Sequence, residues 1–396
     1  MNFIHNIHVL RMKTTFKYIA LFMLLAGLAT GMYAQSSHTA DYISLSAVQD
    51  AEGNSLSAIP VDGSSCNLIF SLVGDRDDAS RRYTAYNLDI ELPFGLEVCH
   101  QDGTPLIALP NDFSIYATGI SGLSHSVSAS ILSNGHVRVA CFSGRNAHFA
   151  KTTGILFQMP VRVSSPFVCP GTQQIRISGQ NLTVQENAKK YIPADRSESI
   201  SLAEGEVSVN LAIPAEVCYS TCVLPFDATV PEGLKAFCCN ETAGETLYLQ
   251  HVEKLKAYTP YILYAKMGYS GTLSGSISTV SYRQNVANGK VRSGYLCGAV
   301  TPQAITTGFV LQSLDAGVKF YFTAGESFLI PSGKCWLEIA ESQARALSFQ
   351  IKNNETQINT PHSDLEAKAP LFDLRGRRVS HPLPGIYIQG NRKLLK

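Results

Sequence analysis

The sequence has little charge, almost no tryptophan and none of the common catalytic motifs. Charged residues make up 16% of its 396 residues, and Trp336 is the single tryptophan. No Gly-x-Ser-x-Gly elbow, His-Glu-x-x-His helix or phosphate-binding glycine loop is present. The sequence therefore offers no recognised motif of a serine hydrolase, a zinc protease or a nucleotide-binding enzyme.

An excess of basic residues is also missing. The chain has 32 lysines and arginines against 31 aspartates and glutamates. Residues 1–34 hold three of the basic residues and no acidic one, so the remainder is close to neutral. A neutral chain has no positive field to attract nucleic acid, and we expect no nucleic-acid partner.

The N-terminus has the pattern of a signal peptide over residues 1–34. A basic stretch begins at Met12, an apolar run spans 18–28, and small residues lead to Ala34. The run is too short for a comfortable membrane helix and no second one follows, so an uncleaved anchor is the weaker alternative. No cysteine lies near the cleavage site, which disfavours a lipid anchor. We predict an exported chain that starts at Met12, with Met1 as the alternative start.

All ten cysteines follow this segment, and an even number in an exported chain is compatible with disulfides. Cysteine is also a common buried residue on strands. Cys141 alternates with Val137 and Val139 and is expected in a core. We expect mixed usage, with two to four bridges whose connectivity the sequence does not define.

Alternation with period two dominates from residue 41 onward. Leu88 and Ile90 share one face of a strand, while Asn87, Asp89 and Glu91 share the other. Asn134-Gly135 between two alternating runs is a strong hairpin signal, because both residues tolerate positive φ. Further strands are expected at 42–48, 68–73, 155–163, 175–177 and 182–184, with Pro160 at a sheet edge or a bulge.

The chain is predicted to be all-β, with two antiparallel sandwich-like modules and a short β-hairpin tail. A signal peptide (1–34) precedes a first sandwich (36–205) and a second β-rich module (206–351). A polar linker (352–369) then leads to a C-terminal tail (370–396). Strands of the second module are expected at 247–252, 261–265, 309–311, 318–322 and 335–339.

The residues that could form a catalytic or metal site are each expected to have an ordinary structural role. Gly268-Tyr269-Ser270-Gly271 is the nearest serine motif, but we expect a flexible loop there. Cys218, Cys222 and the adjacent Cys238 and Cys239 lack the partners of a metal site, and adjacent strand residues point to opposite faces. A cysteine peptidase would pair a thiol with one of four histidines, which we expect to be structural: His100, His125, His148 and His251.

Two features that could bind a ligand also have a structural explanation. The acidic run 75–78 could bind Ca²⁺ but lacks the spacing of a calcium loop, so a solvated turn is favoured. Tyrosines could stack on sugars, although strand tyrosines more often pack across strands, and the lack of tryptophan weakens a lectin reading. The tyrosines concerned are Tyr258, Tyr261, Tyr264, Tyr269, Tyr295 and Tyr321.

The last residues form two short apolar runs, 370–374 and 385–389, around a basic, turn-rich stretch. Their pattern resembles the C-terminal sorting tail of type IX (Por) secretion in Gram-negative bacteria. The resemblance implies delivery to the cell surface or beyond, with the periplasm as the fallback, and contact with the secretion machinery. The tail is shorter than the usual sorting domain. The matching residues are Asp373, Gly376, Arg377, Val379, Gly385, Tyr387, Lys393 and Lys396.

The strand order of the first module also resembles cohesin-type sandwiches, whose fold is shared by several carbohydrate-binding modules. The resemblance follows the strand at 83–93, the hairpin at 127–142 and the strand at 155–163. It implies a fold, and only weakly a ligand.

Together these features predict a non-enzymatic, exported β-protein that binds a glycan or a surface protein, as an adhesin does. We expect no cofactor, no metal, no catalytic residue and no membrane span after signal cleavage. The alternatives are a secreted hydrolase with an unrecognised active site and a structural component of a surface assembly.

Overall fold

The computed structural model describes most of the chain between residues 41 and 352. The described ranges are 41–74, 82–109, 115–116, 118–119, 122–123, 125–184, 189–314, 317–339 and 344–352. The backbone of three short strands nearer the C-terminus, within 371–395, is also described. The predicted signal peptide, the linker and the acidic run 75–78 lie outside the described residues.

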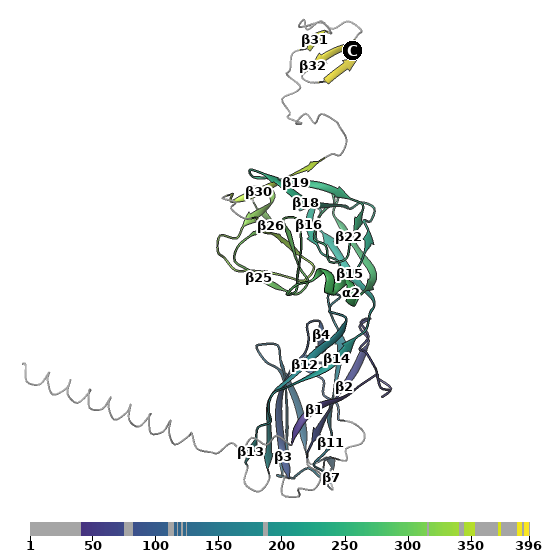
Figure 1. Cartoon of the computed structure of the whole chain (residues 1–396), viewed down its shortest axis with the longest axis vertical. Coiled ribbons are helices and arrows are strands. Elements are labelled where there is room, and N and C mark those ends of the chain that lie inside the picture. Colours follow the sequence, from purple (N-terminus) through teal and green to yellow (C-terminus); the bar gives the residue numbers. More distant parts are fainter. Residues whose placement is uncertain are drawn as a thin grey trace, which may run out of the picture.

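Strands dominate the chain, as predicted (Figure 1). The one helix in the described part is α2 (Thr279–Asn285), which buries none of its residues. Nearly all strand pairs are antiparallel, and the pair β19–β30 is parallel. The all-β class is confirmed.

The first β region, residues 41–202, contains two sheets. The smaller has the order β1-β2-β11-β4 and the larger the order β13-β12-β3-β10-β9, with β14 also paired to β12. The strands of the smaller sheet are β1 (Tyr42–Gln49), β2 (Ser65–Val73), β11 (Gly154–Val163) and β4 (Leu96–Val98). Those of the larger are β13 (Lys190–Tyr191), β12 (Gly171–Val184), β3 (Tyr83–Glu91), β10 (Val137–Phe142), β9 (Ser126–Ile131) and β14 (Arg196–Leu202).

Apolar residues at alternate positions of both sheets belong to one buried cluster between them. Leu88 of β3 and Val139 of β10 are fully buried and lie opposite each other in the register. The rings of Phe70 and Phe157, from neighbouring strands of the smaller sheet, stack with centroids 4.8 Å apart. The predicted period-two pattern thus gives β3 and β10 one core face and one polar face.

The hairpin predicted at Asn134-Gly135 is confirmed. Ile131 pairs with Val137 across it, and Gly135 has a φ of +84°. The prediction for Pro160 is wrong, because β11 pairs with β2 on one side and β4 on the other, and its bulge lies between Ile155 and Phe157. Pro160 has no N–H to donate, but the Cys99 amide donates to its carbonyl at 2.8 Å and the Cys99 carbonyl accepts from the Leu106 amide instead, at 2.7 Å.

Most strands of the second β region, residues 205–352, join one ten-stranded sheet. Its order is β16-β21-β18-β19-β30-β27-β26-β29-β24-β23. The first five are β16 (Tyr219–Cys222), β21 (Tyr261–Tyr264), β18 (Lys235–Ala243), β19 (Thr246–Val252) and β30 (Ala346–Lys352). The others are β27 (Gly317–Phe322), β26 (Phe309–Leu314), β29 (Cys335–Leu337), β24 (Leu296–Ala299) and β23 (Lys290–Ser293).

The two halves of this sheet curl back onto each other. The Val223 amide donates to the Gly333 carbonyl at 2.9 Å, beyond the end of β16 and close to β29. The Tyr295 amide donates to the Cys239 carbonyl at 3.2 Å, which links the β23–β24 turn to β18. The sheet therefore encloses its own apolar cluster, which includes the fully buried Phe320.

Shorter pairs complete this region, chiefly β15 (Gly205–Ile213) with β22 (Tyr269–Ile277) and β25 (Gln303–Ile305) with β28 (Phe328–Ile330). The prediction of a flexible loop at 268–271 is wrong: Gly268 lies in a turn with a φ of +75°, and Tyr269 begins β22. Gly275 lies in this strand because a Cβ there would come within 2.5 Å of the Phe226 ring. The second region also has the pair β17 (Ala228–Thr229) with β20 (Lys254–Leu255). The first region has two further short pairs, β5 (His100–Gln101) with β6 (Thr104–Pro105) and β7 (Thr118–Gly119) with β8 (Gly122–Leu123).

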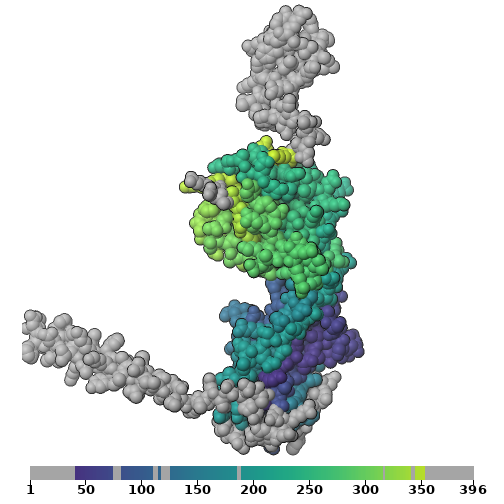
Figure 2. Space-filling view, in the orientation of Figure 1, coloured from purple at the N-terminus to yellow at the C-terminus, as the bar shows by residue number. Residues whose placement is uncertain are grey.

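The two regions are joined by buried contacts. Figure 2 shows the surface narrowing where the teal and green lobes meet. Phe167 of the first region belongs to the core cluster of the second and is 5% exposed. A Cβ at Gly333 would come within 2.8 Å of the Phe167 ring, so glycine makes room for this side chain. The predicted module limits, 36–205 and 206–351, stay predictions.

Candidate functional site

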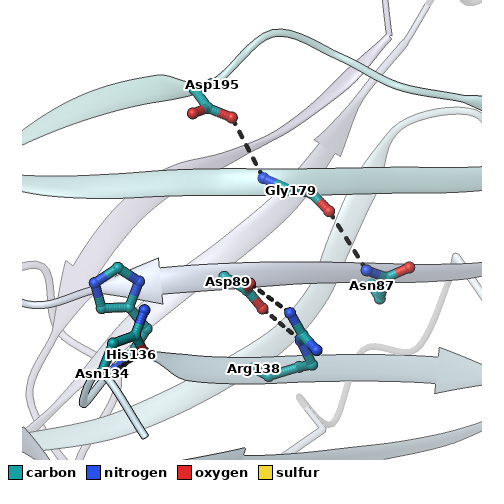
Figure 3. Close-up of polar contacts among 7 residues, drawn as sticks. All are labelled: Asn87, Asp89, Asn134, His136, Arg138, Gly179 and Asp195. Carbon is teal, nitrogen blue, oxygen red and sulfur yellow. Dashed lines mark hydrogen bonds and ion pairs between the residues drawn. The ribbon is translucent and has the colours of Figure 1, made fainter. Parts of the chain in front are cut away.

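The outward face of the larger sheet carries an ordered set of polar side chains. In β3, Tyr86, Leu88 and Ile90 are buried, whereas Asn87 and Asp89 between them reach the surface. Figure 3 shows these two residues beside side chains of the neighbouring strands. We define this polar face by Asn87, Asp89, Arg138, Gly179 and Asp195.

An arginine–carboxylate pair lies at the centre of the polar face. Arg138 and Asp89 are opposite each other in the β10–β3 register. Nε and Nη2 of Arg138 donate to Oδ1 and Oδ2 of Asp89, each at 2.7 Å (Figure 3). These hydrogen bonds raise the pKa of the Arg138 guanidinium. The two-point geometry fixes both side chains in one orientation.

A bulge in β12 brings backbone groups to the same face. The pairing of β12 with β3 shifts between Ser178 and Asn181, and Gly179 within the bulge has a φ of +58°. Its carbonyl accepts a hydrogen bond from Asn87 Nδ2 at 3.4 Å, and its amide donates to Asp195 Oδ1 at 3.3 Å. Asp195 also pairs with Arg176 at 3.1 Å, so opposite charges are interspersed across the face.

A groove of about 390 Å³ lies at one end of this face, where β3 leaves the sheet. Its walls come from the end of β3, the turn after it, β4 and the β9–β10 hairpin. Two large apolar side chains line it while remaining 39% and 44% exposed, Phe94 and Ile131. Polar lining residues are Glu91, Glu97, His100, Asn134 and His136.

The hairpin end of the groove is held by local hydrogen bonds. Asn134 Oδ1 accepts a hydrogen bond from the His136 amide at 3.1 Å, and the Leu132 amide donates to the His136 carbonyl at 2.9 Å. His136 Nε2 lies 3.7 Å from Glu91 Oε2. The sequence analysis predicted this hairpin but not the groove. The exposed phenylalanine in the Pro93-Phe94-Gly95 turn was the signal that could have indicated it.

The histidines considered for catalysis lie in separate places. His125 is buried against the rings of Phe149 and Tyr116, with centroids 4.8 and 5.3 Å away. His251 packs on Phe237, His148 lies 3.4 Å from Arg82, and His100 lines the groove. Within the described residues, no thiol–histidine hydrogen bond forms.

All ten cysteines are free thiols in the structure, so the expected disulfides are not formed. Cys141 is in the core, as predicted, and burial raises its pKa to about 12. Cys239 is buried while Cys238 is partly exposed, in agreement with the prediction of opposite faces. A thiol with a raised pKa is poorly nucleophilic and a poor metal ligand. No group of three or more potential metal ligands occurs in the part of the chain that the structure describes.

Three of the six candidate tyrosines pack against other side chains. Tyr258 and Tyr261 are 2% and 5% exposed, and the Tyr258 ring lies against that of Tyr282 in α2, with centroids 5.4 Å apart. Tyr264 lies opposite Tyr219 across the β16–β21 pair, with ring centroids 4.8 Å apart. Tyr264 thus follows the cross-strand packing alternative, and Tyr258 and Tyr261 are buried.

The residues of the predicted sorting tail fall partly on short strands: β31 (Leu371–Asp373), β32 (Ile386–Gln389) and β33 (Arg392–Leu395). Asp373 pairs with Tyr387, and Lys393 pairs with Ile388. The backbone thus forms three strands where the sequence predicted two. Gly376, Arg377, Val379, Gly385 and Lys396 lie outside the described residues, and the sorting role stays a prediction.

Among the described residues, no helix is long and apolar enough to cross a membrane.

Comparisons with known proteins find similarity among solved structures only. No family model matches the chain, and no curated protein matches it. A cohesin module from a Clostridium perfringens family 33 glycoside hydrolase has 10% identity and a TM-score of 0.31, covering 42% of this chain and 98% of that one. A type I cohesin from a Clostridium thermocellum cohesin–dockerin complex has 13% identity and a TM-score of 0.29, covering 43% and 98%.

A third similar structure is the full-length major pilin SpaD from Corynebacterium diphtheriae. It has 9% identity and a TM-score of 0.27, and covers 71% of this chain and 58% of the pilin. Cohesin modules are thus among the structural neighbours, as the sequence resemblance led us to expect. Similarity this low carries no ligand or partner over to this chain.

Proposed function

We propose that this chain is a non-enzymatic, exported protein that binds another surface protein through the polar face of its larger sheet. The central observation is the Arg138–Asp89 pair, in which both hydrogen bonds are 2.7 Å long. The Arg138 side chain remains 48% exposed although both ends of the pair are fixed. Because the Arg138 side chain is already held in one orientation, a partner that contacts its guanidinium loses little further side-chain entropy on binding.

The surroundings of this pair favour a protein partner. Positive and negative groups alternate over three strands, from Arg138 and Asp89 to Asp195 and Arg176. Such a pattern complements a second patterned surface and sets its register, whereas it gives no net field for a polyanion. The Gly179 bulge adds backbone groups without a side chain above them, so a partner can approach closely.

The hydrolase alternative predicts a nucleophile within hydrogen-bond reach of a histidine. In the ranges of the chain that the structure describes, His125 and His251 pack on rings, His148 lies beside Arg82 and His100 lines the groove, and no hydrogen bond joins any of them to a thiol. Binding is therefore the function that this geometry supports best.

The test uses charge reversal in the full mature chain. We expect proteins extracted from the envelope of the producing cell to be retained by the wild-type chain and lost with Arg138→Glu, by about tenfold or more. Arg292→Glu is the matched control, because Arg292 forms a similarly exposed pair with Glu338 in the second region, at 3.3 Å. Equal retention by both variants, or no retained protein at all, would contradict the proposal.

Export by the tail is a separate proposal that rests on the sequence resemblance. Deletion of residues 370–396 is expected to abolish delivery to the surface, as measured by protease accessibility on intact cells. Undiminished delivery would refute the sorting role and leave the binding proposal unaffected.

A further inference from the structure

The groove at the end of the polar face is a separate site with its own lining. It is formed by two segments that are distant in sequence: residues 91–98 with the nearby His100, and the β9–β10 hairpin with Ile131 and residues 134–137. Its volume of about 390 Å³ is at the lower end of the range of small-ligand pockets. A ligand of one or two rings fits this space better than a large cofactor.

The apolar side of the groove is rigid as well as exposed. Phe94 lies in a tight turn in which the Leu96 amide donates to the Pro93 carbonyl, at 3.1 Å. Gly95 has a φ of +82°, and its carbonyl accepts a hydrogen bond from the Ser164 amide at 2.8 Å. A Cβ at Gly95 would come within 2.3 Å of Val168, so the turn packs directly on the sandwich. The backbone at Phe94 is thereby held in place, while 39% of the residue is open to solvent.

The polar side of the groove has two carboxylates, Glu91 and Glu97, each with a basic side chain nearby. Glu97 accepts hydrogen bonds from Nε and Nη2 of Arg162 at 3.0 and 2.9 Å. Glu91 has His136 at 3.7 Å and remains 49% exposed. A cationic ligand would compete with these partners, whereas a neutral ligand with hydroxyl groups could add hydrogen bonds to the remaining acceptor positions.

We propose that this groove binds one or two rings of a neutral saccharide, with a C–H face of the sugar stacked on Phe94 and its hydroxyls hydrogen-bonded to Glu91 and His136. An aromatic ring provides a flat apolar surface that matches the C–H face of a pyranose. Carboxylate and imidazole groups at the edge of that surface can orient the hydroxyls. Ile131 adds a second apolar side chain to the lining. The site goes beyond the proposed protein-binding face and does not depend on it.

The test measures saccharide binding by the full mature chain. The probes are the methyl glycosides of glucose, galactose, mannose and N-acetylglucosamine, together with cellobiose and maltose, at millimolar concentrations. Saturation-transfer NMR detects binding and calorimetry gives the affinity. We expect at least one probe to bind, Phe94→Ala to weaken it about tenfold or more, and Phe94→Tyr to retain it because the ring is kept.

Two further variants make the result specific. Phe142→Ala removes another exposed phenylalanine, 55% exposed at the far end of β10, and is expected to leave saccharide binding unchanged. Arg138→Glu is also expected to leave it unchanged, which separates this site from the protein-binding proposal. The fold of each variant is checked by circular dichroism and Trp336 fluorescence.

Three outcomes would overturn the saccharide site. They are the absence of binding by every probe, binding that Phe94→Ala does not weaken, and binding of a lysine-rich peptide in place of all saccharides. The last would show that the groove selects a cation through Glu91. None of these results would bear on retention of an envelope protein by the polar face.

Discussion

The two β regions bury their cores in different ways. In the first, two separate sheets enclose an apolar cluster that continues into the second region through Val207 and Leu211. In the second, one ten-stranded sheet curls around a further cluster, to which Phe167 of the first region also belongs. An open pair of sheets presents a broad outer face with strand edges, which suits binding, whereas a curled sheet favours internal closure. The polar face and the groove both lie in the first region.

The largest effect is expected from truncating one core phenylalanine in each region. Phe157 and Phe320 are both fully buried. Phe→Ala in a core costs about 3–5 kcal/mol through lost burial and the remaining cavity. We expect both Phe157→Ala and Phe320→Ala to lower the free energy of unfolding by this amount, as measured by urea denaturation followed by circular dichroism.

Trp336 makes this pair of variants informative about cooperation between the regions. It is the single tryptophan, is 1% exposed and lies in the second region. The cluster that contains Phe157 continues into β15 through Val207 and Leu211. We therefore expect Phe157→Ala to shift the Trp336 fluorescence transition too. If Phe157→Ala instead shifts a transition that only circular dichroism detects, and leaves the Trp336 fluorescence transition where it is in the wild type, the two regions unfold independently.

A smaller effect, at the lower end of that range, is expected at the junction. Phe167 reaches from the first region into the core cluster of the second, against Gly333. Phe167→Ala is expected to cost about 3 kcal/mol and to separate the unfolding transitions seen by circular dichroism and by Trp336 fluorescence. Phe142→Ala is the control, because Phe142 is 55% exposed and its loss should change stability by less than about 0.5 kcal/mol. If the circular dichroism and Trp336 fluorescence transitions still coincide in Phe167→Ala, other contacts between the two regions couple their unfolding.

The first region could be predicted from sequence because its strands alternate clearly. The pattern around Leu88 and the turn at Asn134-Gly135 follow from local chemistry alone, and the structure agrees with both. The groove could not be predicted, since it forms only when the Phe94 turn, β4 and the hairpin meet in space. Sequence also gives no means of deciding which cysteines would pair, and the structure leaves all ten free.

The second region was harder to predict for physical reasons. β22 contains two glycines and three serines, and its exposed residues alternate with half-buried ones, so no strong apolar face marks it as a strand. Gly275 is required by the close approach of Phe226, a contact that depends on tertiary structure. The helix α2 buries none of its seven residues and therefore has no apolar stripe to reveal it.

The smallest effect distinguishes the two regions by pH. Burial lowers the pKa of His125 in the first region, so the folded state favours the neutral imidazole. The unfolded chain binds a proton near the ordinary histidine pKa of about 6.5. Stability is therefore greatest above this pH and falls as the pH decreases toward the lower folded-state pKa, by at most about 1.4 kcal/mol per pH unit. His125→Phe should flatten this dependence in urea denaturation between about pH 7 and pH 5, whereas His251→Gln, at an exposed position on β19, should preserve it. If both variants keep the full slope, the acid sensitivity arises from another group and the buried ring cluster of the first region does not set it.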